Sequence, residues 1–427
     1  MLAVDSSCEK NDEDDNEEDL ETAIVITNGS YLIQAGFDEA EAPRTIFRTV
    51  TGSCVESEHV VYVGDEAMAK KHMLKMQFPI QRGIVSSFHL MEEIWQSVFD
   101  NELRINSKEF PVLLTETPWN PREHREKTAD IFMEPFGVPA CCLIVDALAS
   151  LYDSGRFTGC VLDAGYEVVR GVPIVEGRTI RDCVTRVDIG GKDLDAVMRR
   201  RLTESGISFT GSVDYVSVDI KEKLAYASLD FDAELKRSRS DPSIRKNYEL
   251  PDGSLIDIGA PRFQCPEVLF RPALIGRTCL PVDKIVPHVI MKCDGLVQAS
   301  LYENVICTGG TSSIPQFADR LKLPLSDRAL MGQVLTSSLL IRYLRCTGVL
   351  PTSCSRLRRE YDAYMSRRSE RHIDGVISRP GSAPSWIGAS LFSRFERGVS
   401  GLSDKWVTRA EYEEFGPRIS HRKRRGA

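Results

Sequence analysis

The sequence predicts an α/β protein, either one large two-lobed molecule or a chain of two to three domains. Three observations carry this prediction. The length of 427 residues is too great for one minimal hydrophobic core. Apolar residues make up 42% and charged residues 27%, an average globular composition that excludes a collagen-like, coiled-coil or wholly disordered chain. Finally, β-favouring runs alternate with helical stretches, as they do in α/β folds.

Two β-hairpins of similar pattern are expected. The first joins β-favouring runs at 23–26 and 30–37 through the turn residues 27–29. The second, at 159–178, again has the pattern strand, small-residue turn, strand. Their recurrence is a weak internal repeat.

Between the hairpins, residues 88–103 place apolar side chains at roughly helical spacing and predict a helix. Residues 111–120 predict a buried strand that ends in a turn at Pro118. A new helix is expected directly afterwards, with Asn120 as its N-cap and Pro121 at its first helical position.

The second half continues the alternation. Residues 192–206 and 218–231 predict helices, and residues 236–246 predict a polar, basic loop. The run 248–259 is typical of a hairpin that turns at Asp252 and Gly253.

The charge balance argues against a nucleic-acid-binding surface. Lys and Arg number 54 against 62 Asp and Glu, a net charge of −8, so direct sequence-specific contact with nucleic acid is not expected. Much of the excess lies in residues 9–21, EKNDEDDNEEDLE, whose mutual repulsion predicts a disordered acidic arm over residues 1–21. A solubility tail and a specific partner contact are the two interpretations of this arm.

The remaining compositional signals favour an intracellular protein. The first ten residues lack the pattern of a secretory signal, and no run of eighteen apolar residues predicts membrane insertion. The 12 cysteines show neither CxxC spacing nor histidine companions, so they predict reduced, mostly buried thiols and not a zinc site or a disulfide framework.

Two basic segments have open interpretations. Residues 323–380 include the Arg-rich stretch 355–372, for which a solvated surface insertion, a basic helix on an acidic partner and an error of the gene model are the alternatives. HRKRRGA, at 421–427, is either a nuclear-import string or a solvated tail.

Many strings of this sequence, in order and spacing, resemble the actin and actin-related protein family from about residue 22 to 423. The strings are NGSYLIQAGF (28–37), EAPRTIF (41–47), YVGDEA (62–67), FPIQRGIV (78–85), LLTETPWNPREHREK (113–127), ASLYDSGRFTGCVLDAG (149–165), DIKEKLAYASLDF (219–231), YELPDGSLIDIG (248–259), RFQCPEVLF (262–270), IMKCD (290–294), CTGGTSSIP (307–315), SWIGAS (385–390) and WVTRAEYEEFGPRISHRK (406–423).

The resemblance implies an actin-like, two-lobed fold of duplicated ribonuclease-H-like domains around a central cleft, each with a five-stranded sheet. It also implies ATP or ADP bound in the cleft with Mg²⁺ or Ca²⁺, and partners that are other actin-family or assembly subunits. The domains that follow are an acidic arm (1–21), a small lobe (22–153 and 384–427, with a shortened loop subdomain near 49–78), and a large lobe (154–383, with a subdomain at 190–277 and an atypical insertion near 323–380).

The first phosphate loop departs from the family. The family's DNGSGLVKAGF is TNGSYLIQAGF here, so the metal-side Asp is Thr27, a Gly near phosphate is Tyr31 and the phosphate-binding Lys is Gln34. Residues Asn28, Gly29 and Ser30 match, and the resemblance makes them candidate nucleotide contacts.

The second phosphate loop departs as well. The family's DSGDGVTH is DAGYEVVR, which retains Asp163 and Gly165 but places Tyr166, Glu167 and Arg170 where small, acidic or His residues are expected. Asp163 is a candidate metal ligand by resemblance. The Gln that positions the attacking water falls at Asp146, a carboxylate that would repel phosphate, so no confident catalytic residue is assigned and ATP hydrolysis by the family mechanism is not expected.

The adenosine side matches better. Lys221 and Glu222 correspond to the family's base-contacting pair, and Gly309, Gly310 and Thr311 match its GGT turn. The competing interpretation keeps these glycines as backbone turns, Asp163 as a turn carboxylate, and Lys221 with Glu222 as a surface helix pair.

Three functions fit these patterns. The first is a scaffold subunit of a cytoplasmic, cytoskeletal or related assembly, whose fold matches the family better than its phosphate loops do. The second is an ATP-binding, filament-forming actin-like ATPase, against which the short segment between Gly52 and Tyr62 argues because it shortens the loop that actins insert into the next subunit. The third is a nuclear subunit of a chromatin-remodelling complex.

Overall fold

The computed structural model describes residues 22–54, 61–207, 213–322, 376–378, 383–397, 402–403 and 405–423. Residues 1–21, 55–60 and 208–212, most of the stretch 323–380 and the last four residues lie outside these ranges. Predictions about their structure therefore stay predictions.

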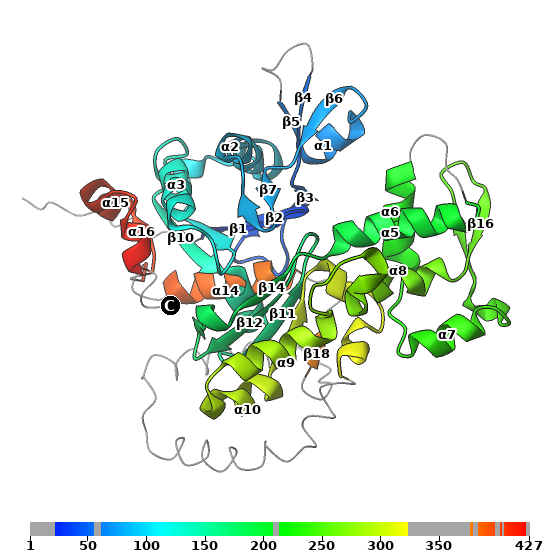
Figure 1. Cartoon of the computed structure of the whole chain (residues 1–427). Helices are drawn as coiled ribbons and strands as arrows, with labels where there is room; N and C mark the ends of the chain where they lie inside the picture. Colours follow the sequence, from blue (N-terminus) through cyan, green and yellow to red (C-terminus); the bar gives the residue numbers. More distant parts are fainter. Residues whose placement is uncertain are drawn as a thin grey trace, which may run out of the picture.

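Two lobes are each built on a mixed six-stranded sheet, one strand more than the resemblance implied (Figure 1). The first sheet has the order β19-β10-β9-β1-β2-β3 and the second has β13-β12-β11-β17-β18, with β14 paired to β12. The strands of the first sheet are β1 (Ile24–Asn28), β2 (Leu32–Phe37), β3 (Thr45–Arg48), β9 (Val112–Glu116), β10 (Ala140–Val145) and β19 (Val407–Thr408). Those of the second are β11 (Gly159–Ala164), β12 (Val169–Val175), β13 (Arg178–Thr179), β14 (Thr185–Val187), β17 (Val305–Thr308) and β18 (Val376–Ser378).

The two sheets repeat one topology. In the first, β1 pairs antiparallel with β2 and parallel with β9, which pairs parallel with β10. In the second, β11 pairs antiparallel with β12 and parallel with β17, which pairs parallel with β18. The weak repeat in the sequence is therefore a duplicated fold, and the strand β18 places residues 376–378 of the predicted insertion in the sheet of the large lobe.

Smaller sheets and helices complete each lobe. The small sheets pair β4 (Thr51–Cys54) with β5 (Val61–Val63) and β6 (Leu74–Gln77), β7 (Ile80–Gln81) with β8 (Ile84–Val85), and β15 (Lys246–Glu249) with β16 (Leu255–Ile258). The α-helices are α1 (Gly64–Ala69), α2 (Phe88–Ser97), α3 (Arg122–Met133), α4 (Asp146–Asp153), α5 (Gly191–Glu204), α6 (Val213–Leu224), α7 (Phe231–Arg237), α8 (Pro261–Phe270), α9 (Val282–Lys292), α10 (Gly295–Glu303), α14 (Pro384–Arg397), α15 (Arg409–Phe415) and α16 (Ile419–Arg422). Short helical turns are η1 (Val98–Leu103), η2 (Ser107–Glu109), η3 (Arg181–Cys183), η4 (Pro242–Ile244), η5 (Pro272–Ile275) and η6 (Gly310–Ser313). None of the helices in the described ranges is long and apolar enough to cross a membrane.

Most predicted elements are confirmed. The loop expected at 236–246 also contains the end of α7, the turn η4 and the first residue of β15, and three predicted boundaries differ. The helix expected at 88–103 is α2 followed by the π-helical turn η1, and the hairpin at 248–259 is β15 with β16. Strand β1 extends to Asn28, so the turn lies at 29–31 and not at 27–29. Helix α6 ends at Leu224, short of the predicted 231, because the chain then bonds to Arg262 and Pro315 instead of continuing the helical ladder.

The third difference concerns the start of α3. Pro121 is the N-cap residue, while the side chain of Asn120 donates to Glu116 at 3.0 Å instead of capping the helix. The nine described cysteines carry free thiols and most are buried, as predicted.

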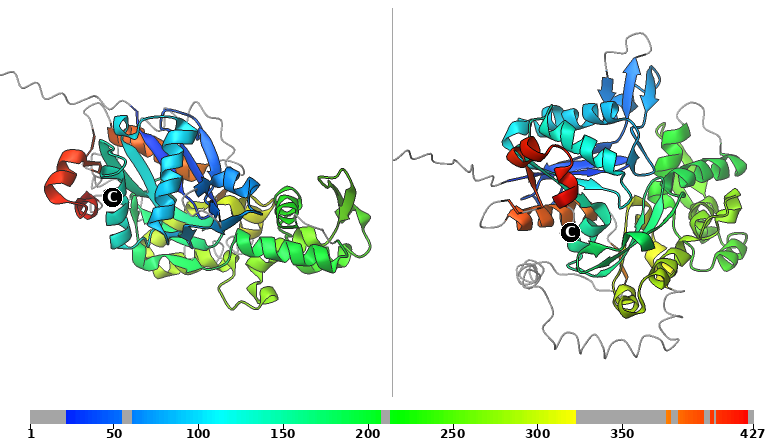
Figure 2. Two further views of the ribbon diagram at one scale, coloured as in Figure 1. Left: turned by 90° about the horizontal axis from the view of Figure 1, so that it is seen from above. Right: turned by 60° about the vertical axis from the view of Figure 1, so that its left-hand side comes forward.

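Helices α4 and α14 lie between the two sheets and bury a shared core (Figures 1 and 2). Trp386 of α14 is fully buried and its indole N–H donates to Val25 O of the first sheet at 3.0 Å. Asp38, also fully buried, accepts hydrogen bonds from Ser393 Oγ at 2.6 Å and forms an ion pair with Arg397. These contacts attach α14 to the first sheet, and Trp386 and Ile387 lie in the core.

Gly388 is a helical residue of α14. A Cβ at this position would lie 1.7 Å from Ala149 O and 2.9 Å from Asp153 N, both in the backbone of α4. The absence of a side chain therefore lets the two central helices touch through their backbones.

We expect Gly388→Ala to destabilise the fold severely, because the added methyl group forces the two helices apart. The loss in the free energy of unfolding should be about 3 kcal/mol or more. Gly295→Ala is the matched control, since nothing lies within 4 Å of a Cβ there. Denaturant unfolding, followed by circular dichroism, measures the free energy of unfolding of both variants. Equal stabilities would contradict the close backbone contact between α4 and α14 at Gly388.

Candidate functional site

The turns of the two equivalent hairpins face each other through a pair of tyrosines. Tyr31, in the turn between β1 and β2, stacks on Tyr166, in the turn between β11 and β12, with ring centroids 4.3 Å apart and planes inclined by 26°. The guanidinium of Arg48 lies 4.9 Å from the centre of the Tyr31 ring. Burial raises the pKa of Tyr31 to about 12, so its hydroxyl stays neutral at physiological pH. Aromatic contact therefore joins the turns that resemble phosphate loops.

A buried arginine lies behind the tyrosines. Arg170, on β12, is 6% exposed and forms ion pairs with both Asp146 and Asp163. Asp163 faces it across the ladder between β11 and β12, and Asp146 is the first residue of α4. The ring of Trp119 lies 5.3 Å from the guanidinium. Three segments of the chain thus converge on one cation.

Burial and mutual charge shift the pKa values of this group. Burial lowers the pKa of Arg170, but the two carboxylates outweigh it and leave that pKa above its usual value. Burial, together with the charge of Asp163, raises the pKa of Asp146 to about 6 against the opposing effect of Arg170. Arg170 is therefore permanently charged, and Asp146 titrates closer to neutrality than an ordinary Asp.

The remaining phosphate-loop side chains bond within the protein. Thr27 Oγ1 donates to Gln34 Oε1 at 3.2 Å. Glu167 accepts hydrogen bonds from the backbone N–H of Arg82 at 2.5 Å and from Lys192 Nζ at 2.9 Å. In the described part of the chain, no group of three or more His, Cys, Asp or Glu side chains is arranged to hold a metal ion.

Arg82 links the lobes, and sequence reasoning did not single it out. Besides its backbone bond to Glu167, its guanidinium lies 3.1 Å from Asp188 Oδ2 of the other lobe. Its backbone has a φ of 51°, which a non-glycine residue seldom adopts. No local pattern announces this contact, because its partners lie 85 and more residues further along the chain.

The residues of the first loop that are predicted to contact a nucleotide form hydrogen bonds with neighbouring parts of the protein. Asn28 Oδ1 accepts from Trp95 Nε1 at 3.0 Å, and Asn28 Nδ2 donates to Thr115 O at 3.3 Å. Ser30 Oγ accepts from the backbone N–H of Gly83 at 3.1 Å, and Gly29 O accepts from Thr49 Oγ1 at 2.7 Å. Asn28 and Ser30 therefore have structural partners of their own.

The predicted contacts of the second loop and of the GGT turn lie together. Thr311 Oγ1 donates to Gly165 O at 2.8 Å, and Gly310 begins the turn η6 beside it. Gly309 has a φ of 87°, and a Cβ there would lie 2.4 Å from both Ala164 O and Asp163 Oδ1. The glycine is required for this close approach, as its interpretation as a backbone turn predicted.

The two residues of α6 that are predicted to contact the base, Lys221 and Glu222, lie in different environments. Lys221 is nearly buried and its Nζ lies 2.6 Å from Asp195 Oδ1 on α5, whereas Glu222 is exposed and its charge acts on Tyr31. Asp195, which sequence reasoning missed, also raises the pKa of Tyr166, although burial contributes more. Lys221 is therefore a buried ion-pair member and not a surface helix residue.

The raised pKa of Asp146 should make the stability of the fold depend on pH. Its folded value of about 6 exceeds the ordinary 3.8, so the folded protein binds this proton more tightly than the unfolded chain does. This contribution is fully present below about pH 4 and is lost as the pH rises through about 6. Urea unfolding across that range should show the stability of the wild type falling by on the order of 2 kcal/mol relative to Asp146→Asn. If the stability of the two proteins changed with pH in the same way, the raised pKa of Asp146 would be contradicted.

A family model matches the greater part of the chain. The model for actin matches residues 18–340, well over half of the 427-residue chain. The match covers the paired hairpins, the turns that face each other and the GGT turn, and the duplicated sheets agree with the two-lobed architecture. Proteins of this family generally bind a nucleotide with a divalent cation. The chain belongs to the actin family.

Proposed function

We propose that this protein is a scaffold subunit of a multiprotein assembly, in which the actin fold is held together without a nucleotide. The observation that carries the proposal is the ion pairing of Arg170 with both Asp146 and Asp163. In this arrangement the guanidinium provides the positive charge between the lobes that a metal ion and its water shell would otherwise provide.

The donors present do not fit a metal-bound triphosphate. A divalent cation prefers carboxylate oxygens, and both carboxylates here already pair with a buried cation. Removing one partner from a buried ion pair costs about 3–5 kcal/mol, so a metal ion would have to offset that loss before it gained anything. Thr27 and Gln34, which stand at the metal-side and lysine positions of the family pattern, bond to each other.

The aromatic contact adds a steric argument. Phosphate binding in such loops needs close approach to backbone N–H groups, which favours glycine. Here Tyr31 and Tyr166 stack against each other, and Glu167 follows Tyr166 in the turn between β11 and β12. The contacts of Glu167 and Arg82 also hold the lobes together directly, so lobe closure does not require a nucleotide to bridge them.

An ATP-binding, filament-forming ATPase is the second candidate. The observation in its favour is that Asp163, Gly165 and the turn from Gly309 to Thr311 lie against one another, as the family resemblance implies. Binding of Mg²⁺ or Ca²⁺ by Asp163 would then require Arg170 to move away.

For the scaffold, we propose actin-family or other assembly subunits as partners and the cytoplasm, with its cytoskeleton, as the location. A nuclear chromatin-remodelling complex is the alternative setting.

The scaffold proposal predicts no specific nucleotide binding by the wild-type protein. Equilibrium dialysis with ATP and with ADP, each with and without Mg²⁺, should show no saturable binding up to about 1 mM. Micromolar, Mg²⁺-dependent binding that Asp163→Asn abolishes would establish the second candidate instead. Exposed Asp252→Asn, in the turn between β15 and β16, is the control for nonspecific effects of charge.

Replacing the guanidinium should turn the site into a cation site. Arg170→Met leaves two carboxylates without their partner, and we expect a loss of about 3–5 kcal/mol in the free energy of unfolding. Millimolar Mg²⁺ or Ca²⁺ should then raise the melting temperature of this variant and not that of the wild type, because the metal replaces the missing charge.

Arg186→Met is the matched control, since Arg186 also lies over Trp119, at 5.2 Å, but pairs with the partly exposed Asp188. It should lose little stability and show no response to the metal. A metal response shared by both variants, or absent from Arg170→Met, would show that the guanidinium does not take the place of a cation.

A further inference from the structure

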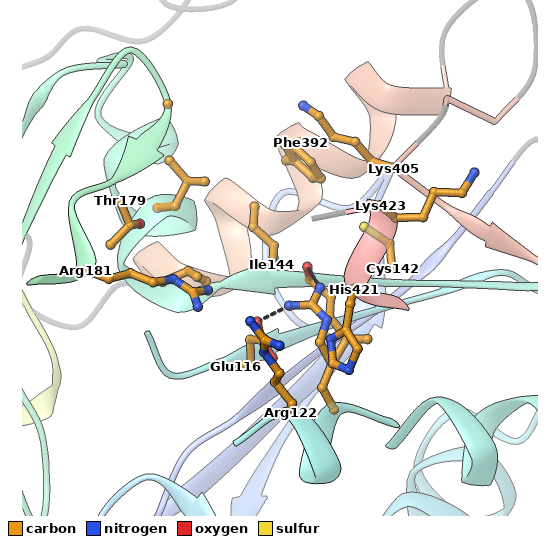
Figure 3. Close-up of a pocket in the computed structure, with 15 residues that line it drawn as sticks. Glu116, Arg122, Cys142, Ile144, Thr179, Arg181, Phe392, Lys405, His421 and Lys423 are labelled. Atoms are coloured by element: carbon orange, nitrogen blue, oxygen red, sulfur yellow. Dashed lines mark hydrogen bonds and ion pairs between the residues drawn. The ribbon is translucent and has the colours of Figure 1, made fainter. Parts of the chain in front are cut away.

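A cavity of about 300 Å³ lies at the boundary between the lobes (Figure 3), and neither Tyr31 nor Tyr166 lines it. One wall comes from β9, β10, the start of α3 and the helix α16, and the other from β13 and η3. Its basic lining residues are Arg122, Arg125, Arg181, Lys405, His421 and Lys423, and its single acidic one is Glu116. A protein of net charge −8 thus concentrates positive charge in one hollow.

Most of these basic groups already have acidic partners. Arg125 forms a buried ion pair with Glu116, and His421 Nε2 lies 2.8 Å from Glu126 Oε1. The ammonium groups of Lys405 and Lys423 each lie 2.6 Å from a glutamate carboxylate. Each of these four basic side chains therefore already lies beside a carboxylate.

Arg122 and Arg181 differ from the other basic residues. In the part of the chain that the structure describes, no carboxylate lies within 4.0 Å of either guanidinium. Burial lowers the pKa of Arg181, and the charges of Arg125 and Arg122 lower it further against the pull of Glu116. Figure 3 shows Arg122 and Arg181 extending toward Glu116 from the two lobes. Three guanidinium groups thus share the single carboxylate of Glu116, which already pairs with Arg125, and the exposed Arg122 and Arg181 have no ion-pair partner of their own among the described residues.

The position of Arg122 adds to the positive potential. It is the first residue of the twelve-residue helix α3, and its N-cap Pro121 offers no side-chain acceptor to the free N–H groups of the first turn. The start of a helix carries a partial positive charge. The opposite part of the cavity is apolar and is formed by the buried side chains of Ile144, Leu148 and Phe392.

We propose that this cavity binds a small organic phosphate, with its phosphate group between Arg122 and Arg181 and its apolar part against Ile144, Leu148 and Phe392. Two guanidinium groups offer more donors than one carboxylate can accept, whereas the three oxygens of a phosphate monoester match them. The volume lies at the lower end of the range of small-molecule sites. Because the two arginines belong to different lobes, the ligand fastens the lobes together. The proposal does not depend on whether the cleft holds a nucleotide.

Calorimetric titration of the full chain with phenyl phosphate tests this proposal. We expect saturable binding, stronger than that of inorganic phosphate, which lacks the apolar part, and stronger than that of benzoate, which lacks the phosphate. Arg122→Gln and Arg181→Gln should each weaken phenyl phosphate binding about tenfold or more. Arg178→Gln is the matched control, because it removes an exposed arginine of β13 that does not line the cavity, and it should leave the affinity unchanged.

Three results would overturn the proposal. No binding of phenyl phosphate at 10 mM would exclude the site, and equal weakening by Arg178→Gln would reduce the effect to general electrostatic attraction. Binding of a synthetic peptide of residues 9–21 that depends on Arg122 and Arg181, without binding of phenyl phosphate, would assign the cavity to an acidic segment of protein. Thermal melts of the four proteins show whether each variant is folded under the titration conditions.

Discussion

The ion pairing of one buried arginine with two aspartates is the constraint on which the centre of this molecule depends. Arg170 and Asp163 come from one lobe, and Asp146 begins the helix that packs between the sheets. Each carboxylate would be costly to bury alone, and the guanidinium would be equally costly without them. The three groups therefore stabilise one another only in the relative position of the lobes that the structure shows.

The same position of the lobes is supported from both sides. Tyr31 stacks on Tyr166 in front of the triad, and Arg82 reaches across to Glu167 and Asp188. Between the sheets, α4 and α14 approach until their backbones touch at Gly388. Protein contacts thus join the two turns that match the family's phosphate loops, and under the scaffold proposal they take the place of a bridging nucleotide.

The basic cavity gives the lobe boundary a different chemistry from that of the paired tyrosines. Behind the tyrosines, Arg170 pairs with Asp146 and Asp163, and Glu167 pairs with Lys192. In the cavity, Arg122 and Arg181 have no ion-pair partner of their own among the described residues, and the one lining carboxylate, Glu116, already pairs with Arg125. An excess of like charge in one hollow raises the free energy of the protein unless an anion joins it. A ligand in this cavity would therefore act on the same lobe arrangement that the triad maintains.

The sequence by itself determined the α/β class, the two hairpins, the helix at 88–103 and the identity of the altered loop residues, because these depend on local periodicity, turn residues and family motifs. It placed boundaries less well, as at Asn28, Pro121 and Leu224, where contacts with distant segments decide where an element ends. Only the tertiary structure decided that Arg170 forms ion pairs with both Asp146 and Asp163, that Asp195 pairs with Lys221, and that Arg122 and Arg181 line one cavity. The physical reason is distance along the chain: charge pairing acts over a few ångströms in space, and no local pattern shows which of 116 charged residues will come that close.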